Sequence, residues 1–177
     1  MRRILCFILC FAAAFGVNAQ ESINEVVSTT TLDKQLPVMI KEQRLYTYKS
    51  QFSVEQTMTR LEKQIKNRQI PIFAILDHAN NAKEVGMQMN SSKVIIFGSP
   101  KVGTVLMQEN PSIALALPLK IAVYEDAKGN VWTSFLKMKF ADQIYPLNDK
   151  SILLKMDELL EDLTIKSSKE VDTTIYF

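Results

Sequence analysis

The sequence contains almost no cysteine or histidine. Its two cysteines, Cys6 and Cys10, and its single histidine, His78, are set in a chain of 177 residues. Both cysteines fall in a leader that we expect to be removed, so the mature chain would have no disulfide and no thiolate metal site. One histidine is also too few for a zinc centre. We therefore expect no cofactor and no resident metal, and a domain that is stabilised by its hydrophobic core.

The leader is the segment 1–19. Two arginines open it, an apolar run continues to Val17, and small residues precede an expected cleavage between Ala19 and Gln20. This order is typical of a secretory signal peptide. The apolar run is too short to span a bilayer comfortably. The sequence thus predicts a periplasmic or secreted protein.

Net charge is absent as well. Two of the 21 basic residues lie in the leader, so the rest of the chain has 19 basic and 19 acidic residues. A neutral chain without a basic cluster lacks the electrostatic footprint of nucleic-acid binding. No later apolar run is long enough to cross a membrane. We expect neither a nucleic-acid partner nor a membrane span.

Periodicity predicts one domain over residues 44–166, after a weakly ordered lead-in over 20–43 and before a polar tail over 167–177. The uneven helix spacing and a hairpin over 119–137 argue against a doubly wound parallel sheet. They favour an α+β domain with a largely antiparallel sheet packed against helices. Strands are predicted over 45–49, 70–76, 94–97, 119–125 and 131–137, and helices over 53–66, 77–86, 99–110, 111–115 and 148–166. The predicted core residues are Val54, Met58, Leu61, Ile65, Ile72, Phe73, Ile95, Phe97, Leu119, Ile121 and Val123.

The stretch GSPKVGT at residues 98–104 follows an apolar strand, as a phosphate-binding loop would. A Walker A loop requires a lysine directly after its second glycine. Here Thr104 follows Gly103, and Lys101 lies inside the loop, so the stretch is not a Walker A loop. Two interpretations remain. Either a glycine ends a strand before a helix that Ser99 caps, or the helix amides and the Lys101 ammonium form an anion site.

Asp77 and His78 follow another apolar strand. Asp77 is predicted to cap a short helix, and no serine near His78 lies in a G-x-S-x-G motif, so a hydrolase triad is not supported. His78 is then either an ordinary residue of the first helical turn or a general acid/base assisted by Asp77 and Lys101.

A copper site is a further alternative. Met87 and Met89 alternate along the chain, and thioethers suit Cu(I), with His78 as a nitrogen ligand. The same alternation is also typical of a core face or a strand edge, where methionine fills irregular gaps.

A longer pattern joins these motifs. The segments FAILDHANNAKEVG, VIIFGSPKVGTVLMQENPSIALALPLKIAVYED and KGNVW together resemble the family known as domain of unknown function 302. The matching positions are Asp77-His78-Ala79, Phe97-Gly98, Pro100-Lys101, Gly103-Thr104, Leu106-Met107 and Leu117-Pro118-Leu119-Lys120. The resemblance implies a compact α+β domain able to form homodimers, and it implies no known activity.

The sequence thus predicts an exported binding domain for a small anion or organic molecule, without an enzymatic role. The ligand-binding residues would be Asp77, His78, Ser99, Lys101 and Thr104. If the two strands before these motifs ran in the same direction, their loops would emerge at one edge of the sheet. Two helix N-termini and one lysine would then converge on an anion. The alternatives are an enzyme that uses His78 and a Cu(I)-handling protein.

Overall fold

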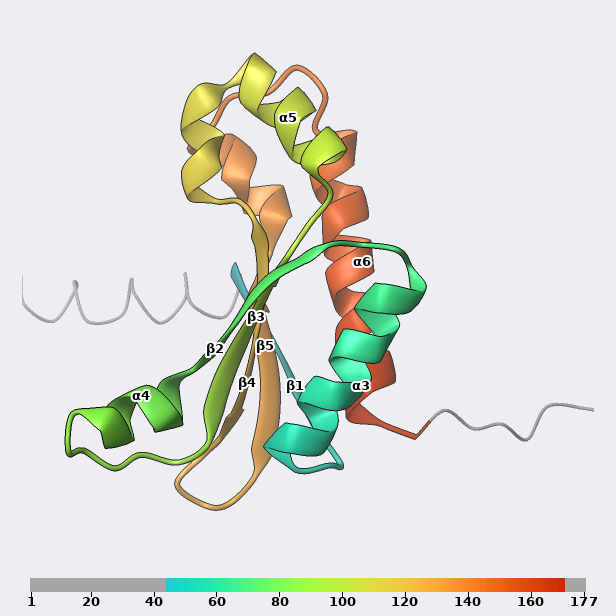
Figure 1. Cartoon of the computed structure of the whole chain (residues 1–177). Helices are drawn as coiled ribbons and strands as arrows, with labels where there is room; N and C mark the ends of the chain where they lie inside the picture. The colour runs from blue at the N-terminus through green and yellow to red at the C-terminus, as the bar shows by residue number, and fades with distance from the viewer. Residues whose placement is uncertain (1–43, 171–177) are drawn as a thin grey trace, which may run out of the picture. The chain divides into compact units, whose positions relative to one another are not determined.

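Five strands form one antiparallel sheet in residues 44–170, the part of the chain that the computed structural model describes. The strand order is β1-β5-β4-β3-β2, so the chain starts at one edge, crosses to the other and returns through the middle (Figure 1). In chain order the elements are β1 (Leu45–Lys49), α3 (Val54–Asn67), β2 (Ile72–Asp77), α4 (His78–Glu84), β3 (Ser92–Phe97), α5 (Pro100–Glu109), η1 (Pro111–Leu115), β4 (Leu119–Glu125), β5 (Val131–Leu136), η2 (Met138–Gln143) and α6 (Ser151–Ser168).

The α+β architecture predicted from the sequence is therefore confirmed. The predicted signal peptide over 1–19 and lead-in over 20–43 lie outside the described residues, as does the tail from residue 171. Within residues 44–170, none of the helices is both long and apolar enough to cross a membrane.

Local chemistry fixes where the helices begin. Ser53 forms a capping box at the start of α3: its hydroxyl accepts from the Gln56 amide at 3.2 Å, and the Gln56 side chain accepts from the Ser53 amide at 3.1 Å. Ser99 caps α5, and Pro100 occupies the first turn, where a missing amide leaves no bond unmade. These helices begin where their sequence predicts because the caps satisfy amides that no helical carbonyl can reach.

Helices α3 and α6 lie side by side and cover one face of the sheet (Figure 1). The core forms between them and the sheet, and Phe97, Ile95 and Ile121 are fully buried there. Of the predicted core residues, all are buried except Ile72, which packs partly buried against the core, and Phe73. Phe73 is 52% exposed, so its assignment to the core was wrong. The strand register shifts between Ile72 and Ala74, so Phe73 lies at an irregularity of the strand.

The end of α6 is held by polar groups. The helix continues to Ser168, two residues beyond the predicted domain end at 166. Ser168 is fully buried, and its hydroxyl lies 3.2 Å from that of Thr133 on β5. Arg60 of α3 donates to the carbonyl oxygens of Ser167 and Lys169, at 3.1 and 2.7 Å. These bonds satisfy carbonyls that the helix end leaves unpaired.

Candidate functional site

The two predicted ligand-binding motifs lie at opposite ends of the sheet. Strands β2 and β3 are antiparallel, and their register pairs Asp77 with Lys93 and Ile72 with Phe97. Asp77 therefore lies level with the beginning of β3, whereas the 98–104 loop follows its end. Six strand residues separate the two ends, about 17 Å at the usual rise per residue. The shared site of Asp77 and His78 with Lys101 was thus wrong, because it required parallel strands.

Asp77 has structural partners. Its carboxylate accepts from the Asn80 amide at 2.9 Å, which caps α4, and lies 3.1 Å from the Lys93 ammonium. Lys93 also pairs with Glu55 at the start of α3. The bond from Asn80 and the contact with Lys93 lower the pKa of Asp77, and Glu55 and Asp77 raise the pKa of Lys93. Lys93, which pairs with both carboxylates, therefore ties β2, β3 and α3 together.

His78 lies in the first turn of α4, as the sequence predicted, and its side chain is partly exposed. Within residues 44–170 its imidazole has no side-chain hydrogen-bond partner that would orient it for acid/base catalysis, and no group of three or more His, Cys, Asp or Glu is arranged to hold a metal ion. Met87 and Met89 follow α4 in a loop and are 65% and 50% exposed. The Cu(I) hypothesis stays a prediction.

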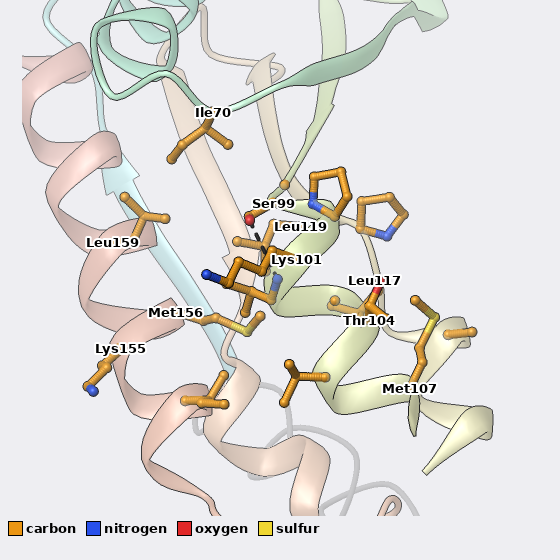
Figure 2. A pocket seen from close by; sticks show the side chains of 18 of the residues that line it. Ile70, Ser99, Lys101, Thr104, Met107, Leu117, Leu119, Lys155, Met156 and Leu159 are labelled. Carbon is orange, nitrogen blue, oxygen red and sulfur yellow. Dashed lines mark hydrogen bonds between the residues drawn. The ribbon is translucent and has the colours of Figure 1, made fainter. Parts of the chain in front are cut away.

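A pocket of about 760 Å³ opens at the other end of the molecule, between α5 and α6 (Figure 2). Helix α5 forms one wall, α6 forms another, and residues at the beginnings of β2 and β4 and in the segments before them close it. Its apolar lining consists of Ile70, Phe73, Pro100, Val102, Val105, Met107, Ala114, Leu117, Pro118, Leu119, Ile152, Met156 and Leu159. The volume lies within the range of small-molecule sites.

Three predicted residues, Ser99, Lys101 and Thr104, line this pocket. The Ser99 hydroxyl is turned toward the helix, where it accepts from the Val102 amide at 3.5 Å. The Lys101 side chain extends from α5 toward α6, where Met156 lies (Figure 2). The GSPKVGT stretch thus begins a helix, and its Lys101 lines a cavity; the anion site stays a prediction.

The contribution of α6 to the pocket was not predicted from the sequence. Lys155 and Met156 lie in the second turn of that helix, and both line the pocket. The sequence predicted a helix over 148–166 and assigned no residue of that helix to a site. One signal was present in the sequence: the first turn of α6 contains no acidic residue, although helix N-termini favour them.

The pocket is electrically positive. Among the described residues its lining includes two lysines, Lys101 and Lys155, and no aspartate, glutamate or histidine. Neither ammonium forms an ion pair within residues 44–170. Asp149 lies nearby. Hydrogen bonds from Ser151 lower the pKa of its carboxyl, and the charge of Lys155 lowers it further by a smaller amount. The N-terminal turns of α5 and α6 add partial positive charge at the same place.

These features describe a small α+β domain with an apolar, positively charged pocket at one end of its sheet. The family model of the domain of unknown function DUF302 matches residues 46–163, and the chain belongs to that family. The fold agrees with the crystal structure of an uncharacterized conserved DUF302 protein from Bacillus stearothermophilus: the TM-score is 0.62 and the identity 19%, over 71% of this chain and 98% of that one.

Part of the chain is also similar to longer proteins. It is 40% identical over 88 residues to fluoride-specific ion channel FluC 1 of Brucella suis, over 50% of this chain and 35% of that protein. The same identity and length of match relate it to fluoride-specific ion channel FluC 2 of Brucella melitensis, of which 33% is covered. The matched part of the chain thus spans about a third of the length of these curated relatives.

Proposed function

We propose that this domain binds a small organic anion in the pocket between α5 and α6. The observation that carries the proposal is a cavity of about 760 Å³ whose wall is mostly apolar and whose charged residues are two lysines. An apolar body would displace water from the wall, and an acidic group would meet Lys101 and Lys155. The proposal keeps Ser99, Lys101 and Thr104 as ligand-contacting residues and leaves out Asp77 and His78.

The side chains around the pocket favour binding over catalysis. Apart from the lysines, the polar side chains of the lining are those of Ser99 and Thr104. Ser99 serves as a helix cap, and a proton-transfer step would need a base within hydrogen-bond reach of the substrate. His78, the general acid/base of the enzymatic alternative, is not among the lining residues.

A dye with the proposed chemistry tests the function. Anilinonaphthalene sulfonate carries an apolar ring system and one anionic group, and its fluorescence rises when it leaves water. We expect saturable binding to the full chain, and loss of binding in Gly103→Phe, because a Cβ at Gly103 has Leu117 and Met107 at 3.8 Å and a ring built on it would fill the pocket. Val85→Phe is the matched control, since it adds the same ring at a position that is 72% exposed and outside the lining.

Circular dichroism verifies that both variants fold as the wild type does. Equal dye binding by the wild type, Gly103→Phe and Val85→Phe would refute binding in this pocket.

Fluoride is a second candidate ligand. The observation in its favour is the 40% identity with proteins named as fluoride-specific ion channels. Lys101 and Lys155 would hold the halide. The apolar wall disfavours it, because apolar side chains cannot replace the hydrogen bonds to water that a small anion loses on burial. A fluoride titration followed by thermal unfolding tests this candidate. A stabilisation that disappears in Lys101→Met would favour fluoride, and no stabilisation beyond that from chloride would reject it.

We also propose that the domain is exported and forms homodimers. The face of the sheet opposite α3 and α6 supports a dimer, because Leu136 and Leu76 are 68% and 41% exposed there. Val94 pairs with Leu76 and points to the same side. Sedimentation of the full chain measures the dimer, and Leu136→Lys should shift it toward monomer. A monomer at all concentrations would contradict the proposal.

A further inference from the structure

We infer that the ligand of the pocket is a single-chain aliphatic carboxylate, with its tail against the apolar wall and its carboxylate between Lys101 and Lys155. The inference rests on the proposed binding function and adds the chemical class of the ligand. It follows from the polarity of the wall, from the kind of apolar side chains in it, and from the position of the two lysines.

The wall has few groups that could bind a polar ligand. A nucleotide or a sugar carries many donors and acceptors, and burying each of them without a partner costs free energy. In the described residues, Ser99 and Thr104 are the lining side chains with a hydroxyl, and the Ser99 hydroxyl already accepts a bond from its helix. The ligand therefore has one polar group and an otherwise apolar body.

The apolar side chains favour a flexible chain over a flat ring system. Phe73 is the one aromatic residue among the lining residues, and the rest of the apolar wall is aliphatic or thioether. Met107 and Met156 contribute from two different helices, and methionine adapts to a ligand of variable shape. Without a second aromatic ring, a planar ligand would have little to stack on.

The two lysines determine where the carboxylate of the ligand would lie. Lys101 occupies the first turn of α5, where the helix dipole disfavours a cation, and the first turn contains no acidic residue to offset it. Lys155 lies in the second turn of α6, on the other wall (Figure 2). Both side chains can lay their methylene stems along the apolar wall and hold their ammonium groups at its margin. A carboxylate between them would offset the unfavourable position of Lys101 at the start of α5.

Calorimetry of a homologous series is the direct experiment. Octanoate, decanoate and dodecanoate are titrated into the full chain below their micellar concentrations. If the tail is buried, affinity should rise about fourfold for each added methylene until the pocket is filled. Octylamine tests the sign of the charge and should not bind, whereas octanol should bind more weakly than octanoate.

Lys101→Met and Lys155→Met separate the charge from the tail. Each removes an ammonium and keeps an apolar side chain of similar length, so each should weaken octanoate binding by about twofold to fivefold and leave octanol binding unchanged. Lys128→Met is the matched control, because Lys128 is exposed in the β4–β5 turn and outside the lining. Added salt should weaken octanoate more than octanol.

The outcomes distinguish failure of the inference from failure of the proposed function. Dye binding that depends on Gly103, with no dependence on tail length, would overturn the aliphatic ligand and leave the proposed function standing. If dye binding does not depend on Gly103 and affinity does not depend on tail length, the proposed function and the inference are overturned together. Equal affinity for octylamine and octanoate, or binding of vesicles of anionic phospholipid without binding of the free carboxylates, would also overturn the inference.

Discussion

Truncation of two phenylalanines tests the placement of the core and of the pocket. Phe97 lies on β3, faces α3 and α6, and is fully buried, whereas Phe73 is 52% exposed and lines the pocket. Phe97→Ala leaves a cavity in a packed interior, so it should lower the free energy of unfolding by about 3–5 kcal/mol. Phe73→Ala removes a ring that is about half buried, which corresponds to roughly 1 kcal/mol when full burial contributes about 1.5–3 kcal/mol.

Urea unfolding of the full chain, followed by far-ultraviolet circular dichroism, measures both values. With a denaturant slope of about 2 kcal/mol/M, the midpoint should fall by roughly 2 M for Phe97→Ala and about 0.5 M for Phe73→Ala. Binding should show the opposite ranking, because only Phe73 contacts the proposed ligand. Equal destabilisation by the two variants would refute the register shift in β2, and an effect below about 1 kcal/mol for Phe97→Ala would refute the assignment of β3 to the centre of the core.

Four further predictions concern other parts of the chain. Ser53→Ala should cost about 1 kcal/mol in the same titration, since it removes the cap of α3. Arg60→Met should speed hydrogen exchange at the end of α6, because it removes the donor to three carbonyls. Asp126 accepts hydrogen bonds from Trp132 and two backbone amides, which hold its pKa well below its usual range. The stabilisation from these bonds is present above about pH 4 and is lost on acidification. Asp126→Ala should therefore flatten the acid side of a plot of melting temperature against pH. Mass spectrometry of the exported protein should show an N-terminus at Gln20, and retention of Cys10 would contradict export by a cleaved signal peptide.

The strands and helices were predictable because each is specified locally. The capping box at Ser53, the Ser99-Pro100 start of α5 and the turn at Gly129, whose φ is +79°, are short-range features. Gly86, with φ +75°, likewise ends α4 as predicted. Such features depend on hydrogen bonds and backbone conformations within a few residues, so one sequence is enough to place them. The order and direction of the strands depend on pairings between distant segments, which no local pattern encodes.

Phe73 shows how a local pattern can fail inside a correctly predicted strand. The run from Ile70 to Leu76 is almost entirely apolar, so alternation could not identify which residues face the helices. The register shift between Ile72 and Ala74 then displaced Phe73 toward the 98–104 loop, where a Cβ on Gly98 would lie 3.8 Å from its ring. A continuous apolar run predicts that a strand is covered on both faces, whereas here Phe73 lines a pocket.

The predicted convergence of Asp77 and His78 with the 98–104 loop was wrong, and its error was one of topology. Convergence of two helix N-termini on Lys101 was expected from α4 and α5, on the assumption that β2 and β3 were parallel. Their antiparallel pairing sends α4 to the far end of the sheet, while α6 begins beside α5 and descends along α3 (Figure 1). The helix that faces Lys101 is therefore more than 50 residues later in the chain, and it brings Lys155 with it. A lysine in the first turn of a helix is locally unfavourable, and that cost was already visible in the sequence at Lys101. Its proposed role in ligand binding rests also on the second lysine, Lys155, which the packing of α6 supplies.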